Sequence, residues 1–108
     1  MPKAYWIARV DVTDPDAYKL YAQRNDAVFA KFGGRFLVRA GRFENPEGSG
    51  RGRNVVIEFP SYEVALACYR SPEYAPQITL RQSAAEADVV IVEGYDGPQP
   101  GAQCVQRS

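Results

Sequence analysis

The sequence predicts an α+β domain, a two-layer sandwich whose elements follow one another in the order β-α-β-β-α-β. Two helical patterns alternate with runs of β-branched and aromatic residues, which indicate four strands, at residues 5–12, 35–42, 53–59 and 87–93. A length of 108 residues allows one hydrophobic core and no second one. We therefore expect a single domain over residues 1–95 and a flexible tail over residues 96–108, where Gly, Pro and Gln dominate.

The charge balance argues against a polyanionic partner. The formal net charge is zero at pH 7 and the isoelectric point is about 6.2, so the chain lacks the positive field that non-specific binding to nucleic acid or to an anionic membrane requires. No apolar stretch approaches the roughly 20 residues of a membrane span, and the first residues contain no signal-peptide core. We expect a cytoplasmic protein that binds neither nucleic acid nor membrane.

The chain contains no histidine, which removes several kinds of chemistry. Ser-His-Asp and Cys-His nucleophiles are excluded, so any proton transfer falls to carboxylates, tyrosines, lysines or cysteine. Cys68 and Cys104 lie far apart and form no paired-cysteine motif, which predicts free thiols and no zinc, iron or haem site. Only a carboxylate site for magnesium or calcium stays open, and we predict no cofactor.

The first strand and the first helix have clear periodicities. Along residues 5–12, one face carries Trp6, Ala8, Val10 and Val12, and the other carries Tyr5, Ile7, Arg9 and Asp11. Thr13 or Asp14 can cap the helix that follows, and Gly33 with Gly34 ends it. The inward stripe of this helix advances by three and four residues, through Ala17 or Tyr18, Tyr21, Asn25, Val28 or Phe29, and Phe32.

The second and third strands are predicted to form a hairpin with a long loop, because residues 44–50 are turn formers. If the hairpin centres near Gly48 and Ser49, one face holds Phe36, Val38, Val55, Ile57 and Phe59, and the other holds Leu37, Arg39, Val56 and Glu58. In this register, Arg39 lies opposite Glu58.

The second helical region shows two start signals. Ser61 can cap a helix, and Ser71 followed by Pro72 repeats the signal, so we expect a break near Arg70 and a continuation to about Gln82. The last strand contains Val-Val-Ile-Val at residues 89–92, which makes it apolar on both faces.

This element order is that of a ferredoxin-like sandwich, a four-stranded antiparallel sheet with its helices on one face. The other face would leave Tyr5, Ile7 and half of the apolar last strand in water. Burial of one such side chain stabilises by about 1.5 to 3 kcal/mol, so this exposure is unfavourable. We expect a homodimer that pairs two open sheet faces across a two-fold axis. The alternative is that the tail folds back over the sheet.

Three stretches, residues 33–39, 55–61 and 69–74, together with Arg81, resemble the bacterial family called domain of unknown function 1330. The similarity extends from about Lys3 to Tyr95. It implies a ferredoxin-like fold within the dimeric α/β-barrel group and implies no activity. Two positions depart from the family pattern, which commonly has glycine in place of Ala40 and tryptophan in place of Cys68. If that tryptophan lines a pocket, the pocket of this chain is larger or absent.

The ligand-binding candidates are Tyr18, Asn25, Arg39, Glu58, Tyr69 and Tyr74. Arg39 beside Glu58 can orient an anionic or carbonyl ligand, or form a surface ion pair worth well under about 1 kcal/mol. The tyrosines can aim hydroxyl groups into the space between sheet and helices, or pack as edges of the core. Asn25 interrupts an apolar stripe, so its amide must find a partner, which can also be the backbone.

Two functions from different classes follow. In the first, the space between sheet and helices binds a small aromatic or carbonyl-bearing metabolite, with cofactor-independent turnover of the kind that some dimeric α/β-barrel monooxygenases and isomerases perform. In the second, the chain is a non-catalytic dimeric binding or accessory module whose polar residues are structural. The residues name no substrate, and they leave open whether the protein is an enzyme.

Overall fold

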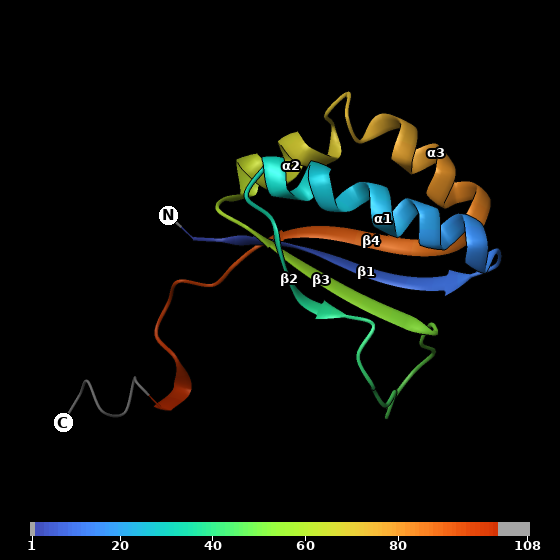
Figure 1. The fold of residues 1–108 in the computed structure, drawn as a ribbon. Helices are drawn as coiled ribbons and strands as arrows, with labels where there is room; N and C mark the ends of the chain where they lie inside the picture. The colour runs from blue at the N-terminus through green and yellow to red at the C-terminus, as the bar shows by residue number, and fades with distance from the viewer. Residues whose placement is uncertain (1, 102–108) are drawn as a thin grey trace.

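The computed structural model describes residues 2–101, which form a four-stranded antiparallel sheet with three helices on one face (Figure 1). The elements are β1 (Ala4–Val12), α1 (Pro15–Lys31), β2 (Arg35–Arg39), β3 (Arg53–Phe59), α2 (Tyr62–Tyr69), α3 (Ala75–Ala84) and β4 (Ala85–Glu93). The strands lie in the spatial order β2-β3-β1-β4. The predicted α+β ferredoxin-like sandwich is confirmed. None of the helices in residues 2–101 is both long and apolar enough to cross a membrane.

The helix ends lie close to where the start and stop signals place them. Asp14 caps α1, because its Oδ1 accepts a hydrogen bond from the backbone N–H of Ala17 at 3.2 Å. Gly33 follows this helix with φ of +75°, a left-handed conformation that glycine adopts without steric cost. The predicted break between α2 and α3 is confirmed at Ser71, whose Oγ donates to the carbonyl oxygen of Cys68 at 2.7 Å.

The predicted register between β2 and β3 is wrong. Phe36 pairs with Ile57 but Val38 pairs with Val56, so β2 contains one extra residue at a β-bulge. Beyond the bulge, every side chain of β2 changes face, since side chains alternate with a period of two. The pairing is also shifted before the bulge, since Glu58 lies opposite Arg35. Arg39 lies opposite Val55, and the strand ends there, three residues earlier than predicted.

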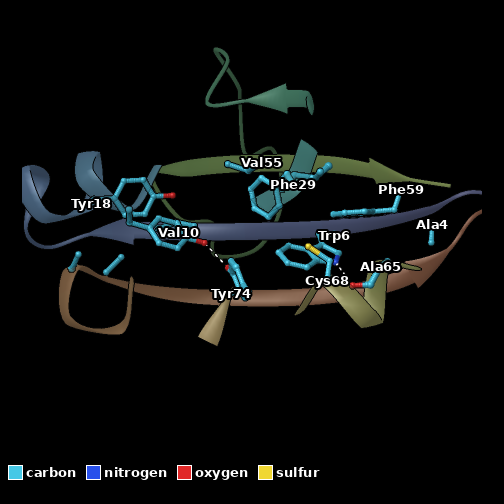
Figure 2. Close-up of a cluster of buried hydrophobic side chains, with 14 residues drawn as sticks. Ala4, Trp6, Val10, Tyr18, Phe29, Val55, Phe59, Ala65, Cys68 and Tyr74 are labelled. Atoms are coloured by element: carbon cyan, nitrogen blue, oxygen red, sulfur yellow. Dashed lines mark hydrogen bonds between the residues drawn. The ribbon is translucent and has the colours of Figure 1, made fainter. Parts of the chain in front are cut away.

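Trp6 occupies the centre of the core, between the sheet and the helices (Figure 2). The residue is 3% exposed, and its Nε1–H donates to the carbonyl oxygen of Ala65 in α2 at 3.0 Å. Its ring centroid lies 5.1 to 5.5 Å from those of Phe29, Phe59, Tyr69 and Tyr74. Such edge-to-face and tilted contacts stabilise beyond simple burial.

The face of the sheet that the helices leave uncovered carries a continuous apolar row. Val38, Val56, Ile7 and Val90 are successive cross-strand neighbours from β2 through β3 and β1 to β4. We call these four residues the open-face row. Val38 is 40% exposed and Val90 is 52% exposed, so the two ends of the row lie largely in water.

The segment that follows β4 leads away from the domain as far as residue 101 (Figure 1). Its first contact is the hydrogen bond from the N–H of Gly94 to the carbonyl oxygen of Lys3 at 2.7 Å. The described part of this segment does not cover the open-face row. It therefore does not follow the alternative prediction, in which the tail folds back over the open face of the sheet. The flexible tail stays a prediction, and residues 102–108 of it lie outside the described residues.

Ala40, directly after β2, has a φ of +59°, in the left-handed region that favours glycine. We predict that Ala40→Gly raises the free energy of unfolding by about 1 kcal/mol, because it removes the steric cost of a Cβ atom in this conformation. Chemical denaturation measures the change. Ala27→Gly is the matched control at an exposed position of α1, where the same exchange should lower stability by about 1 kcal/mol. A loss of stability in both variants would contradict the prediction.

Cys68 is fully buried in α2. Burial, and then the nearby Glu73 carboxylate, raise the pKa of its thiol from the ordinary value of 9.0 to about 12. In unfolded chains the thiol ionises first as the pH rises, so its stabilising contribution is complete below pH 9 and is lost between pH 9 and about 12. We predict that, in a Cys104→Ser background, raising the pH from 8 to 10.5 destabilises the Cys68 protein relative to its Cys68→Ala variant by up to about 2 kcal/mol. Equal losses in both proteins would refute the assignment.

Candidate functional site

A small cavity lies between the sheet and helices α1 and α3. Its volume is about 40 Å³ and it is partly open to solvent. This is room for about three water molecules. The apolar wall comes from the sheet and α1 and includes Trp6, Val10, Phe29, Phe36, Val55 and Ile57. The polar lining consists of Tyr18, Tyr21, Asn25, Arg39, Arg53, Tyr74 and Arg81.

Helix α1 supplies three of the polar groups because of its repeat. Tyr18, Tyr21 and Asn25 follow one another at steps of three and four residues, so they lie on one face of the helix. All three are buried. The same spacing that places apolar side chains in the core thus brings two phenols and an amide to one side of the cavity.

The most buried part of the cavity contains a hydrogen-bonded chain of two tyrosines and an arginine. The hydroxyl oxygens of Tyr21 and Tyr74 are 2.6 Å apart, and Arg81 Nη1 donates to the Tyr74 oxygen at 3.0 Å. In Figure 2, the bond between the two hydroxyl groups is the dashed line that ends at the hydroxyl of Tyr74. Tyr74 is 0% exposed and Arg81 is 8% exposed.

The electrostatics of this chain keep Tyr74 and Arg81 protonated. Burial is the main cause that raises the pKa of Tyr74 above its usual range, and the neighbouring Tyr21 raises it further. For Arg81, burial alone would lower the pKa, but the phenol oxygens of Tyr74 and Tyr21 outweigh it and the pKa is raised. Tyr74 is therefore a neutral phenol and Arg81 a cation at physiological pH.

Two polar atoms at the cavity lack a partner within the described residues. Asn25 is 2% exposed, and its Oδ1 accepts no hydrogen bond from residues 2–101. The Nε of Arg53 is likewise buried and unpaired. The guanidinium carbon of Arg53 lies 5.1 Å from the ring centroid of Tyr18, in the range of a cation–π contact. Burial raises the pKa of Tyr18, an effect that Arg53 partly offsets.

Arg39 marks the opening of the cavity. Its guanidinium lies 4.0 Å from the ring centroid of Phe36, and its Nη2 donates to Oδ1 of Asp26 at 3.0 Å. The two charged side chains are 39% and 56% exposed. Such an ion pair in water contributes at most about 1 kcal/mol, so the Arg39 side chain can leave this position at little cost.

The cavity lining is cationic. It contains three arginines, and none of its residues is a carboxylate. Arg39 is paired with Asp26, whereas Arg53 and Arg81 form no ion pair with any residue in the range 2–101. Such a lining can donate hydrogen bonds and balance negative charge. It offers no group that accepts a proton at neutral pH, because the arginines stay charged and Tyr18 and Tyr74 stay protonated.

Four of the six candidates from the sequence lie in the cavity lining, namely Tyr18, Asn25, Arg39 and Tyr74. Tyr69 does not line the cavity, and its ring packs 5.5 Å from those of Trp6 and Tyr74. Glu58 lies on the opposite face of the sheet, where its carboxylate is 3.5 Å from Lys3 Nζ and 3.9 Å from Arg35 Nε.

Three polar residues of the lining were not among those candidates. Tyr21 lies on the predicted inward stripe of α1, and this position is the signal that could have marked it as a site residue. Arg81 follows Ile78 by three residues on the same helix face, which marks an inward position for an arginine. Arg53 lies two residues before Val55, and alternation along β3 places both on the inward face.

The family model described as "Domain of unknown function (DUF1330)" matches residues 3–95 of the chain. Cys68, one of the two departures from the family pattern, does not line the cavity. No curated protein matches the chain.

Several solved structures share the fold. Methylated RPA0582 from Rhodopseudomonas palustris is 21% identical, with a TM-score of 0.72, and the alignment covers 93% of this chain and 84% of that one. SnoaB from Streptomyces nogalater, a cofactor-independent oxygenase, is 14% identical, with a TM-score of 0.62 and coverage of 90% and 97%. A dimeric protein of unknown function and ferredoxin-like fold from Bacteroides fragilis is 15% identical, with a TM-score of 0.57 and coverage of 85% and 96%. Identities this low show the shared fold alone.

Proposed function

The chain belongs to the DUF1330 family, and we propose that it is a homodimeric protein that binds a small aromatic or carbonyl-bearing metabolite in the cavity between sheet and helices. Asn25 is the observation that carries this proposal. An amide oxygen that is buried without a partner costs about 1 to 3 kcal/mol, and this one belongs to a residue that lines a cavity. A bound ligand that donates a hydrogen bond would remove that cost.

The size of the cavity sets a condition on the ligand. A cavity of about 150 Å³ accommodates a benzene ring, whereas this one measures about 40 Å³. An aromatic ligand therefore places a small polar group inside and enters further only when a side chain at the opening moves. Arg39 is the residue that can move most readily, because only an exposed ion pair and a ring contact hold it.

Binding is better supported than turnover. The fold shared with SnoaB supports oxygenase chemistry by analogy only. Abstraction of a proton from the ligand requires a base within hydrogen-bond reach, and the cavity lining contains arginines, phenols and an amide. The side chains of the cavity thus suit recognition of a ligand that already carries its charge.

The open-face row supports the dimer. Val38, Val56, Ile7 and Val90 form an apolar strip across all four strands, with Tyr5 and Val92 as cross-strand neighbours beside it. Two such strips packed face to face would remove both from water, in a self-complementary contact with two-fold symmetry. The similar Bacteroides fragilis protein is described as dimeric, which supports a dimer here.

We also propose that the protein acts in the cytoplasm. The support is the free, buried thiol of Cys68, since reducing compartments keep thiols unpaired.

The test of the binding function uses the single tryptophan of the chain as a reporter. Trp6 lines the cavity, so we expect a ligand bound there to shift its indole N–H signal in a ¹⁵N-correlated NMR spectrum. A panel of benzaldehyde, benzamide, benzoate, the three hydroxybenzoates and phenylpyruvate is added in turn. We expect at least one compound to shift the signal saturably and to raise the melting temperature.

Two variants make the test specific for the cavity. Arg39→Ala removes a side chain from the cavity opening and should reduce the ligand-induced rise in melting temperature. Glu58→Ala removes a charge on the opposite face and should leave that rise unchanged. A panel in which no compound shifts the Trp6 signal, or equal losses in both variants, would contradict the proposed site.

A further inference from the structure

We propose that the ligand of the cavity is an aromatic carboxylate, whose carboxylate group is held by Arg81, Arg53 and one phenol of the tyrosine pair. The inference rests on the proposed function and names the chemical class of its ligand. Its basis is the balance of charges and of hydrogen-bond donors and acceptors in the lining.

The charge balance is the first reason. Arg81 is 8% exposed and forms no ion pair with residues 2–101. Arg53 also forms no ion pair with these residues, and its Nε is buried. Removing an unpaired cation from water is costly unless an anion or several acceptors face it. The partners of Arg81 are neutral phenols, so the cavity retains positive charge that an anionic ligand would balance.

The count of hydrogens is the second reason. Tyr21 and Tyr74 have two hydroxyl hydrogens, and one of them forms the 2.6 Å bond between the two oxygens. Whichever tyrosine donates in that bond, the other hydrogen has no acceptor among the described residues, because Tyr74 accepts from Arg81 rather than donating to it. The remaining phenolic hydrogen and the Arg53 Nε–H are therefore both donors that have no acceptor among the described residues. A carboxylate offers about four lone-pair sites on two oxygens and can satisfy both. The unpartnered Asn25 oxygen would accept from a hydroxyl group elsewhere on the ligand, which the hydroxybenzoates of the panel carry.

The size and the walls of the cavity fit the same class. A volume of about 40 Å³ accommodates a carboxylate group but not an aromatic ring. Trp6, Phe29 and Phe36 line the cavity beside the polar groups and provide faces for a ring that lies toward the opening. An inorganic anion would balance the charge but would leave these apolar faces without contact.

The test compares benzoate with benzamide, which has the same shape and no charge. Affinities are measured from the shift of the Trp6 indole signal in the full-length chain. We expect benzoate to bind wild type at least tenfold more tightly than benzamide. Arg81→Gln should lower the affinity for benzoate at least tenfold and leave benzamide within twofold, and Arg53→Gln should act in the same direction. Arg24→Gln, at an exposed position of α1, is the control and should change neither affinity.

Arg53→Gln also guards against a folding defect, because Arg53 is only partly buried and its loss leaves the Tyr21–Tyr74 pair intact. Equal affinities for benzamide and benzoate, or an unchanged preference in both arginine variants, would overturn the carboxylate assignment while the proposed binding function stands. Failure of every panel compound to shift the Trp6 signal would overturn both.

Discussion

Replacing Val90 by lysine is expected to convert the protein from a dimer to a monomer. Val90 is the most exposed member of the open-face row, so a lysine there reaches water in the monomer and leaves the fold intact. In a face-to-face dimer, each protomer would instead bury one ammonium group against an apolar strip. An unpaired charge in such an interface costs several kcal/mol, which is enough to shift a micromolar dimer to monomer.

Light scattering after size-exclusion chromatography measures this effect. The wild type should show twice the chain mass of 12.0 kDa, and Val90→Lys should show the chain mass. Leu20→Lys is the matched control, because Leu20 is similarly apolar and 39% exposed but lies on helix α1. This control should stay dimeric. A monomeric wild type at micromolar concentration would show that the open face does not pair.

Replacing Asn25 by leucine is expected to make the protein more stable and less able to bind. The leucine has a similar size and removes the unpartnered Oδ1, so the free energy of unfolding should rise by about 1 to 3 kcal/mol. The same change removes the amide that a ligand hydroxyl or N–H would contact. Opposite signs for stability and binding are typical of residues that are kept for function at a cost in stability.

Chemical denaturation and the hydroxybenzoate arm of the ligand panel test this pair of effects. Asn25→Leu should abolish the rise in melting temperature that the hydroxybenzoates cause in wild type. Gln23→Leu, at an exposed position of the same helix, should change stability by less than about 0.5 kcal/mol and leave binding intact. A less stable Asn25→Leu protein would mean that the amide has a structural role in the core.

The fold could be predicted from the sequence because each element has a strong local signal. Alternation in β1 placed Trp6 and Val10 on the core face, and both are buried. Capping residues set the helix starts at Asp14 and Ser61. The element order predicted that the helices cover only one face of the sheet, which the structure shows.

The relation between Arg39 and Glu58 could not be predicted, because it depends on the register of the hairpin and on a β-bulge. Leu37 and Val38 are both apolar and both exposed, so no change of hydrophobic pattern marks the extra residue. A single inserted residue moves Arg39 from the face of Glu58 to the cavity opening. Long-range pairing across the loop sets this register.

The cationic character of the cavity could also not be predicted from the sequence. Arg81 and Arg53 look like solvated residues of a helix and of a hairpin, since arginine is rarely buried without an acid. Asn25 was visible, because a polar residue on an apolar stripe breaks the expected pattern. Only the packing of α1 and α3 against the sheet reveals that these groups share one cavity.

A crystal structure of the wild-type protein grown with saturating benzoate is the most direct test of a ligand site in this cavity. We predict density for one benzoate per chain, with its carboxylate within hydrogen-bond distance of Arg81 or Arg53 and its ring beside Phe29 and Phe36. A well-ordered structure in which that cavity contains only solvent would contradict the assignment of an aromatic carboxylate to this cavity.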